Sequence, residues 1–244
     1  VGPGRRWAMA EAPVHALRQV REALGGTVND VVLAAVAGAL HRWLRAHGEP
    51  TRGRSLRALV PVSLRRVGAG PSLGNRLSAV LVDLPVGPMG ARRRLRLVSE
   101  RTARLKASAQ ATGVAFLVGI GSWAPSPLHA LAAWAAGRLR FVNLAVSNVP
   151  GPEVPLSVAG ARVLAHYPAL PLAEGMGLSI GCTSLADTMG FGVTAAPETL
   201  SDVEALAAGL AEAVEELRQA ASHPAGRQGE GSGRTVGERA PERP

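Results

Sequence analysis

Apolar residues recur along the chain with two different periods, and these periods predict alternating helices and strands. Over residues 13–24 the apolar positions share one face of a helix. Residues 31–40 are apolar on nearly every side, which is typical of a buried helix. Thr27 and Asp30 stand before that run with the spacing of a capping box. The second helix is therefore expected over residues 27–46.

Shorter apolar runs bounded by glycine and proline predict strands. The run at 77–86 is almost uninterrupted, which favours an interior strand covered on both faces. Two more helices follow from the pattern, a basic one at 90–109 and an amphipathic one at 201–220. Strands are expected at residues 6–12, 56–64, 77–86, 141–149, 161–167, 177–183 and 189–195.

This order of elements predicts an α/β (α+β) fold, a mixed β-sheet packed with helices in one domain over residues 1–220. Residues 221–244 hold almost nothing to bury and are expected to be a disordered tail. Residues 107–137 carry no charged side chain, but glycines and prolines interrupt them. A pair of buried or interfacial helices is favoured there over a membrane span. Within it, residues 114–134 are open to three interpretations: core packing, the lining of a tunnel for an apolar chain, or contact with a bilayer.

Composition narrows the classes of function. Hydrophobic residues make up 47% of the chain and aromatic residues only 3%, so the core is expected to be aliphatic. The formal charge of +9 comes almost entirely from arginine, since Lys106 is the single lysine. No basic helix is interleaved with aromatic residues, so nucleic acid is not an expected partner. The single cysteine, Cys182, excludes an internal disulfide and a cysteine-based metal site and reads as a buried, inert thiol.

No catalytic signature stands in this sequence. The six histidines are separated from one another, and none lies in a GxSxG or HExxH setting. Attack of a hydroxyl group on a carbonyl needs a base near the hydroxyl and donors for the developing oxyanion. The chain is therefore expected to contain no active-site base and no metal site of its own.

Five segments in collinear order resemble a known family. They are TVNDVVLAAVAGAL (27–40), ALVPVSLR (58–65), LGNRLSAVLVDLPVG (73–87), NLAVSNVPGPEVPLSVAGARV (143–163) and YPALPLAEGMGLSIGCTSLADTMGFGVTA (167–195). Together they resemble the C-terminal domain of the wax ester synthase/diacylglycerol acyltransferase (WS/DGAT) family, from about Arg6 to Leu217.

The resemblance implies half of a CoA-dependent acyltransferase fold of the chloramphenicol acetyltransferase type, in which two related halves face each other across a channel. It implies transfer of a fatty acyl group from acyl-CoA, as co-substrate without a further cofactor, to diacylglycerol or a long-chain alcohol. The family's base is the second histidine of an HHxxxDG motif in the N-terminal half. That half is expected to be the chain's partner, and the chain is expected to be inactive alone. Valine in place of methionine at position 1 also indicates a trimmed chain or a start codon other than ATG.

Four residues are candidates for the channel or the oxyanion site. Asn29 and Asp30 match an Asn-Asp motif of the family, and they either shape the channel or serve only as the start of a helix. Ser147 and Asn148 end a strand. The resemblance implies a small polar side chain facing the reacting carbonyl at this point, whereas both residues are also common turn formers.

Three arginines are candidates for the phosphates of CoA, namely Arg76, Arg92 and Arg93. A turn around Arg76 and a solvated helix face around Arg92 and Arg93 are the favoured explanations without a ligand. The expected location is the cytoplasm, with peripheral contact at the inner face of the plasma membrane or a lipid droplet. The alternative function is a non-catalytic lipid- or CoA-binding module. That module predicts a closed, polar surface, whereas half of an enzyme predicts an exposed apolar face.

Overall fold

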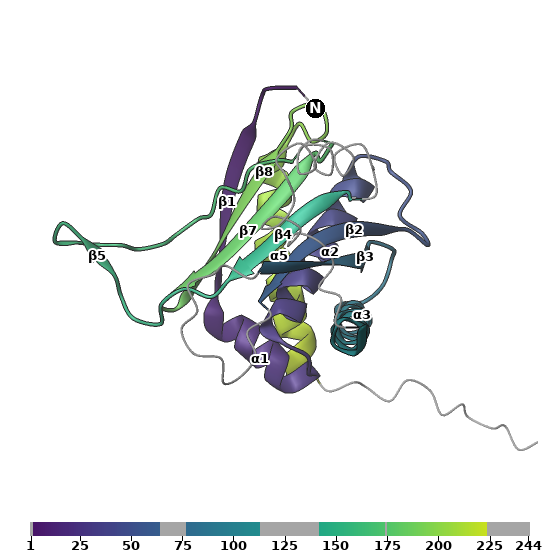
Figure 1. The fold of residues 1–244 in the computed structure, drawn as a ribbon, viewed down its shortest axis with the longest axis horizontal. Helices are drawn as coiled ribbons and strands as arrows, with labels where there is room; N and C mark the ends of the chain where they lie inside the picture. Colours follow the sequence, from purple (N-terminus) through teal and green to yellow (C-terminus); the bar gives the residue numbers. More distant parts are fainter. Residues whose placement is uncertain (1, 64–76, 113–141, 174, 224–244) are drawn as a thin grey trace, which may run out of the picture.

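A mixed β-sheet forms the centre of the molecule (Figure 1). The computed structural model describes residues 2–63, 77–112, 142–173 and 175–223. The six strands lie in the order β1-β8-β7-β4-β2-β3. β4 runs parallel to both of its neighbours, and the remaining pairs are antiparallel. The strands are β1 (Arg6–Pro13), β2 (Ser55–Ser63), β3 (Leu77–Pro85), β4 (Leu144–Val149), β7 (Leu178–Leu185) and β8 (Thr188–Ala195).

Helices cover one face of this sheet and bury the core against it (Figure 1). They are α1 (Val14–Leu24), α2 (Val28–Ala46), α3 (Ala91–Thr112) and α5 (Val203–Ser222). Every residue from Asp30 to Leu40 is buried, because α2 packs against its helical neighbours as well as the sheet. The two glycines Gly25 and Gly26, at φ 81° and 82°, let the chain bend by 102° between α1 and α2.

The opposite face, here called the outer face, is covered unevenly by the described residues. Residues 166–170, here called the strap, cross β8 and reach β7 (Figure 1). They can approach so closely because Gly181, Gly190 and Gly192 carry no side chain. A Cβ atom built on Gly190 would lie 2.1 Å from the carbonyl oxygen of His166, and one built on Gly192 would lie 2.0 Å from that of Pro168.

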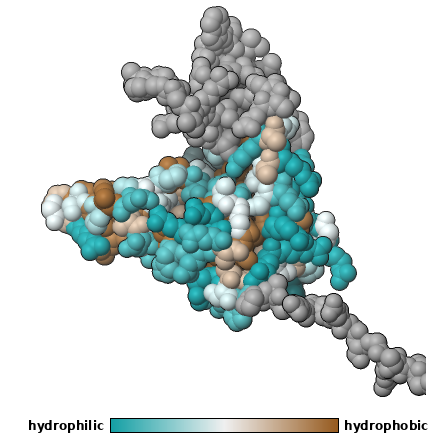
Figure 2. Space-filling view, turned by 90° about the horizontal axis from the view of Figure 1, so that it is seen from below, coloured by the Kyte–Doolittle hydropathy of each residue, from teal (hydrophilic) through white to brown (hydrophobic). Residues whose placement is uncertain are grey.

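A second segment, residues 152–165, projects from the body and is here called the arm. It contains the short hairpin β5 (Ser157–Val158) and β6 (Ala161–Arg162). Its turn places Ala159 and Gly160 at φ 50° and 82°, the left-handed region that tight hairpin turns use. Figures 1 and 2 show it standing out from the sheet with apolar side chains on its surface.

Most of the predicted elements are confirmed within a few residues, including the capping box at Thr27 and Asp30. Two predictions are wrong. The 77–86 strand is not interior, because β3 ends the sheet in the described part of the chain. The apolar residues of β3 contribute to the face of the sheet that the helices cover, and α3 packs against β3 there. The predicted strand at 161–167 holds only the two residues of β6, because the chain then turns onto the glycines of the outer face.

Two predictions concern residues that the structure describes only in part. The uncharged stretch 107–137 lies outside the described residues except for the last turns of α3. The expected tail lies outside them from residue 224 on, and α5 itself continues to Ser222.

No single helix among the described residues is long and apolar enough to cross a membrane. Only α1 and α2 taken together, with their sharp bend, have the length and composition for it.

The glycine contacts make a stability prediction. Gly192→Ala places a methyl group against the backbone of Pro168, so we expect the free energy of unfolding to fall by about 1–3 kcal/mol. The matched control is Gly209→Ala in α5, where the nearest atom to a new Cβ is 3.6 Å away. That change is expected to be neutral or to stabilise by up to about 1 kcal/mol. Urea denaturation measures both, and equal losses would contradict the close approach.

Candidate functional site

Asp30 is held in a buried hydrogen-bond network that joins two helices. Its Oδ2 accepts hydrogen bonds from the backbone N–H and the hydroxyl of Thr27, at 2.8 and 2.9 Å. Its Oδ1 accepts a hydrogen bond of 2.6 Å from the hydroxyl of Thr102 in α3. With 3% of its surface exposed, Asp30 caps α2 and ties it to α3. This geometry favours the structural interpretation of Asp30, while the neighbouring Asn29 is half-buried.

Ser147 and Asn148, adjacent in β4, point to opposite faces of the sheet. Asn148 pairs with Cys182, whose side chain belongs to the core beneath the helices. Ser147 pairs with Gly181, whose missing side chain would point at the strap. Since paired positions on neighbouring strands face the same way, Ser147 faces the outer side. The structure therefore separates the two candidates, and only Ser147 shares a face with the strap.

Two apolar residues near Ser147 on the outer face, Ala145 and Leu59, are here called the apolar floor. Ala145 precedes Ser147 by two positions and pairs with Leu59 of β2, and both side chains are half-buried. The ion pair of Arg57 and Asp83, with Nε and Oδ1 2.8 Å apart, lies further along the same face on β2 and β3. Among the described residues, this apolar floor lies between that ion pair and the strap.

The arginine candidates differ in their surroundings. Arg92 donates to the backbone carbonyl groups of Ala220 and His223, so its guanidinium caps the end of α5. Arg93 is exposed. Both line a shallow groove of about 470 Å³ between α3 and the α1–α2 turn, together with Leu24, Gly26, Leu95, Arg96, Ser99 and Glu100. Arg76 lies outside the described residues.

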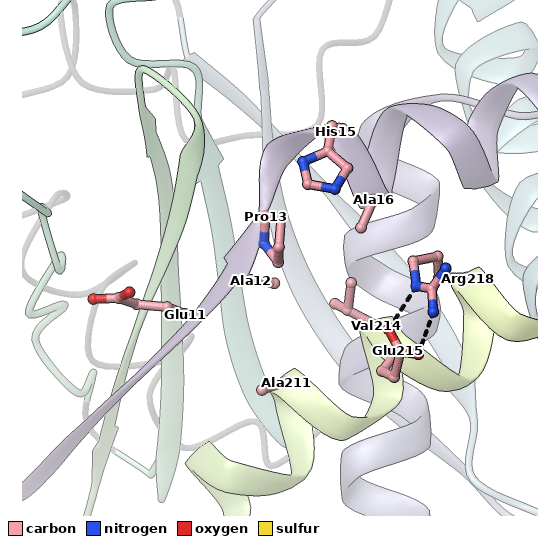
Figure 3. A pocket seen from close by; sticks show the side chains of 9 residues that line it. All are labelled: Glu11, Ala12, Pro13, His15, Ala16, Ala211, Val214, Glu215 and Arg218. Atoms are coloured by element: carbon pink, nitrogen blue, oxygen red, sulfur yellow. Dashed lines mark hydrogen bonds and ion pairs between the residues drawn. The ribbon is translucent and has the colours of Figure 1, made fainter.

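A second groove, of about 230 Å³, lies between β1, α1 and α5 and is shown in Figure 3. It contains His15 and Glu215, residue types that could move a proton. However, Arg218 donates two hydrogen bonds of 2.7 and 2.6 Å to the carboxylate of Glu215. With a further bond from Gln219, these lower the pKa of Glu215 to about 2. At neutral pH this carboxylate is ionised and engaged by its arginine, which makes it a poor base.

Among the other described histidines, His41, His47 and His223 have structural contacts, while His166 is exposed. Nδ1 of His41 lies 2.7 Å from the carbonyl oxygen of Val86. His47 stacks on Trp43 and lies 3.4 Å from Asp202, at the junction of α2 and α5. His129 lies outside the described residues.

Neither the thiol nor a metal centre supplies an alternative chemistry among the described residues. Burial raises the pKa of the Cys182 thiol, which keeps it protonated and inert. The described residues contain no group of three or more His, Cys, Asp and Glu side chains that could hold a metal ion. The described residues therefore offer an apolar surface with the hydroxyl group of Ser147, and not a set of catalytic side chains.

Sequence reasoning missed the strap, although a signal for it was present. Gly190 and Gly192 alternate along one strand, so they share one face, and Gly181 lies opposite Gly192 on the next strand. Glycines gathered on one face of a sheet indicate that another backbone approaches closely. Their pairing across strands is invisible in the sequence, because it depends on the register.

Comparison with known proteins agrees with this architecture. Residues 73–218 match the WS/DGAT C-terminal domain family. The chain is 38% identical over 218 residues to a probable diacylglycerol O-acyltransferase of Mycobacterium tuberculosis, covering 87% of this chain and 46% of that protein. It is 30% identical over 221 residues to O-acyltransferase WSD of Acinetobacter baylyi, covering 88% and 46%.

Solved structures share the fold. The wax ester synthase/diacylglycerol acyltransferase of Marinobacter aquaeolei VT8 matches with a TM-score of 0.69 and 26% identity, over 90% of this chain and 50% of that one. The epimerization domain of tyrocidine synthetase B matches with a TM-score of 0.55 at 12% identity, over 89% and 48%, which shows the fold alone.

The layered sheet and these neighbours define the chain as an α/β domain of the acyltransferase and condensation-domain fold. More narrowly, the chain belongs to the wax ester synthase/diacylglycerol acyltransferase family and matches its C-terminal domain. It spans about half the length of the curated relatives that it matches.

The network around Asp30 predicts that the two residues of the Asn-Asp motif differ in their effect on stability. Asp30→Ala leaves the donors of Thr27 and Thr102 without their acceptor, so we expect the free energy of unfolding to fall by about 2 kcal/mol or more. Asn29→Ala is expected to change it by less than about 0.5 kcal/mol. Thermal and urea unfolding of both variants measure the difference. Equal losses would show that Asp30 is not the structural member of the pair.

Proposed function

We propose that this chain is the C-terminal half of an O-acyltransferase that moves a fatty acyl group from acyl-CoA to diacylglycerol or a long-chain alcohol. The observation that carries the proposal is the apolar floor around Ser147 on the sheet face away from the helices. The activities for which the relatives are named, diacylglycerol O-acyltransferase and wax ester synthase, support the same reaction for this chain.

In the proposed reaction, the N-terminal half and this chain each supply part of the catalytic machinery. The acceptor hydroxyl attacks the thioester carbonyl, a base removes the hydroxyl proton, and the CoA thiolate leaves. An imidazole of the HHxxxDG motif in the N-terminal half acts as the base. In this chain, Ser147 donates a hydrogen bond to the oxyanion that forms on the carbonyl carbon. The floor of Leu59 and Ala145 holds the aliphatic part of a substrate away from water.

The arm supports an N-terminal half as the partner. Its apolar side chains Val154, Leu156, Val158 and Leu164 are 42–79% exposed (Figure 2). Its base is tied down, since Arg18 pairs with Glu153 at 2.8 Å and Ala186 donates a hydrogen bond to the carbonyl of Pro152. An anchored projection with an apolar surface is suited to docking on another body. It also argues against the alternative of a self-contained lipid- or CoA-binding module, which predicts a closed, polar surface.

The solvent-exposed side of α3, in the helix layer, is the proposed contact for anionic groups. These are either CoA phosphates or lipid headgroups at the inner face of the plasma membrane or a lipid droplet. Arg93 fits this role better than Arg92, because Arg92 already donates to two carbonyl groups. Arg96 adds a second exposed guanidinium. Its Nε lies 3.9 Å from Oε1 of Glu100, which makes a long, weak ion pair. Arg76 stays a candidate by resemblance alone.

Reconstitution tests the proposed function. The chain is co-expressed with the N-terminal half of the M. tuberculosis relative and assayed with palmitoyl-CoA and either diacylglycerol or hexadecanol. We expect ester formation from the pair, and a Ser147→Ala chain is expected to lower kcat by about 10²–10³ because the oxyanion loses a donor.

Two results would count against this assignment. Turnover by the chain without any second half would place the base within this sequence. An unchanged kcat for Ser147→Ala, in a variant with wild-type thermal stability, would remove Ser147 from the site. Ser184→Ala serves as a matched control, since Ser184 accepts a hydrogen bond from the backbone of Gly151 and bears no proposed role in the reaction.

The arm makes its own prediction. Leu164→Asp puts a charge on the most exposed large apolar side chain of the described residues, at 79% exposure. We expect the affinity of the chain for the N-terminal half to fall at least about tenfold, since burying an unpaired charge is costly. Gln19→Asp adds the same charge on the exposed side of α1 and is expected to leave the affinity unchanged. Equal affinities for the two variants, measured by calorimetry, would contradict docking through the arm.

A further inference from the structure

The strap ends beside the serine at the centre of the proposed site. Its first contact is with β8, where the backbone of His166 lies on Gly190. The backbone of Pro168 then lies on Gly192, and the chain reaches Gly181 of β7 with Pro168 and Leu170. Gly181 is the direct parallel partner of Ser147 in β4. The strap therefore ends one strand away from Ser147 and on the same face.

Pro168 and the side chain of Leu170 together occupy the space that a side chain at position 181 would fill. A Cβ atom built on Gly181 would lie 2.7 Å from Cβ of Pro168 and 3.2 Å from Cγ of Leu170. Neighbouring strands lie about 4.8 Å apart. Leu170 thus stands over β7, the strand next to the one that holds Ser147, on the same face of the sheet.

The position of Leu170 is fixed by its backbone. The fully buried hydroxyl of Ser179 donates a hydrogen bond of 3.0 Å to the carbonyl oxygen of Leu170. Ser179 is the parallel partner of Ala145, so this anchor lies directly beside the apolar floor. The strap is also held further back, where the Tyr167 hydroxyl donates to Glu11 and its ring meets Trp7 edge to face at 6.5 Å. Leu170 itself is half-buried and retains exposed apolar surface.

We propose that Leu170 is a specificity-determining residue that stops an aliphatic chain running across the floor from β2 towards β7. This inference rests on the proposed function of the same face. A chain that crosses Leu59 and Ala145 meets Leu170, because the strap rises above the sheet at the next strand. The size of this one side chain then sets how many carbon atoms fit beside Ser147. The aliphatic chain belongs either to the acyl donor or to the acceptor, and the two have the same chemistry.

The test uses the reconstituted pair and measures kcat/KM in two series. One series varies the acyl-CoA from twelve to twenty carbons with hexadecanol as the acceptor. The other varies the alcohol over the same range with palmitoyl-CoA as the donor. Leu170→Ala is expected to raise the ratio of the longest to the shortest substrate by roughly tenfold or more in one series, since each methylene in an apolar pocket is worth about tenfold or more. The series that responds identifies which chain lies against Leu170.

Two further variants keep the test decisive. Leu170→Val is expected to fold normally and to shift the ratio in the same direction by a smaller factor. Leu172→Ala is the matched control, as another half-buried leucine close by in the chain that is not among the nearest neighbours of the three glycines. Its ratios are expected to equal those of the wild type.

The outcomes separate the two proposals. No ester formation by the wild-type pair would refute the proposed function and the role of Leu170 with it. Wild-type turnover with unchanged ratios in both series, for Leu170→Ala and Leu170→Val alike, would refute the role of Leu170 alone. An equal shift in Leu172→Ala would show that the ratio reports a general loosening of the segment, which also overturns the proposal.

Discussion

The close approach of the strap to three glycines organises the outer face of this domain. Backbone carbonyl groups of His166 and Pro168 lie where side chains of the sheet would otherwise stand. This contact seals β7 and β8 on the face that the helices leave free, so both strands are buried along almost their whole length. β4 and β2 keep half-buried side chains on the same face. The boundary between the sealed and the accessible part therefore runs between β7 and β4, where Ser147 and Gly181 pair.

The helix layer gives this arrangement a rigid support. α2 and α5 pack against each other and against the sheet, and the network at Asp30 joins α2 to α3. Two arginines, Arg42 and Arg94, share the carboxylate of Glu216 between α2, α3 and α5. A support of this kind keeps the strand that holds Ser147 in place, which is what a donor to a developing charge requires.

Local signals made much of the fold predictable. The Thr27–Asp30 spacing and the helical periods need only the immediate neighbours in the chain, and α2 begins as they indicate. Long-range pairing was not predictable in the same way. The apolar run of β3 reads as an interior strand because the sequence does not show that one helix covers it at the edge of the sheet. The strand predicted at 161–167 holds only β6, because the chain then leaves the hairpin for the glycines of β7 and β8, and the sequence does not show that contact.

The candidate site was predictable in kind but not in geometry. Resemblance pointed to Ser147 and Asn148 together, and only the register with Gly181 and Cys182 shows that the two face opposite ways. Arg92 and Arg93 look alike in sequence. The structure gives Arg92 a partner at the end of α5 and leaves Arg93 exposed. Such distinctions depend on contacts between residues that are far apart in the chain.

Photolabelling tests most directly whether the outer face is one wall of a reaction channel. An acyl-CoA with a diazirine on its acyl chain is bound to the chain paired with an N-terminal half, irradiated, and mapped by peptide mass spectrometry. The account predicts labels on β2, β4 and the strap, around Leu59, Ala145 and Leu170. Labels confined to α1, α3 and α5 would place the acyl chain on the helix side and contradict the account.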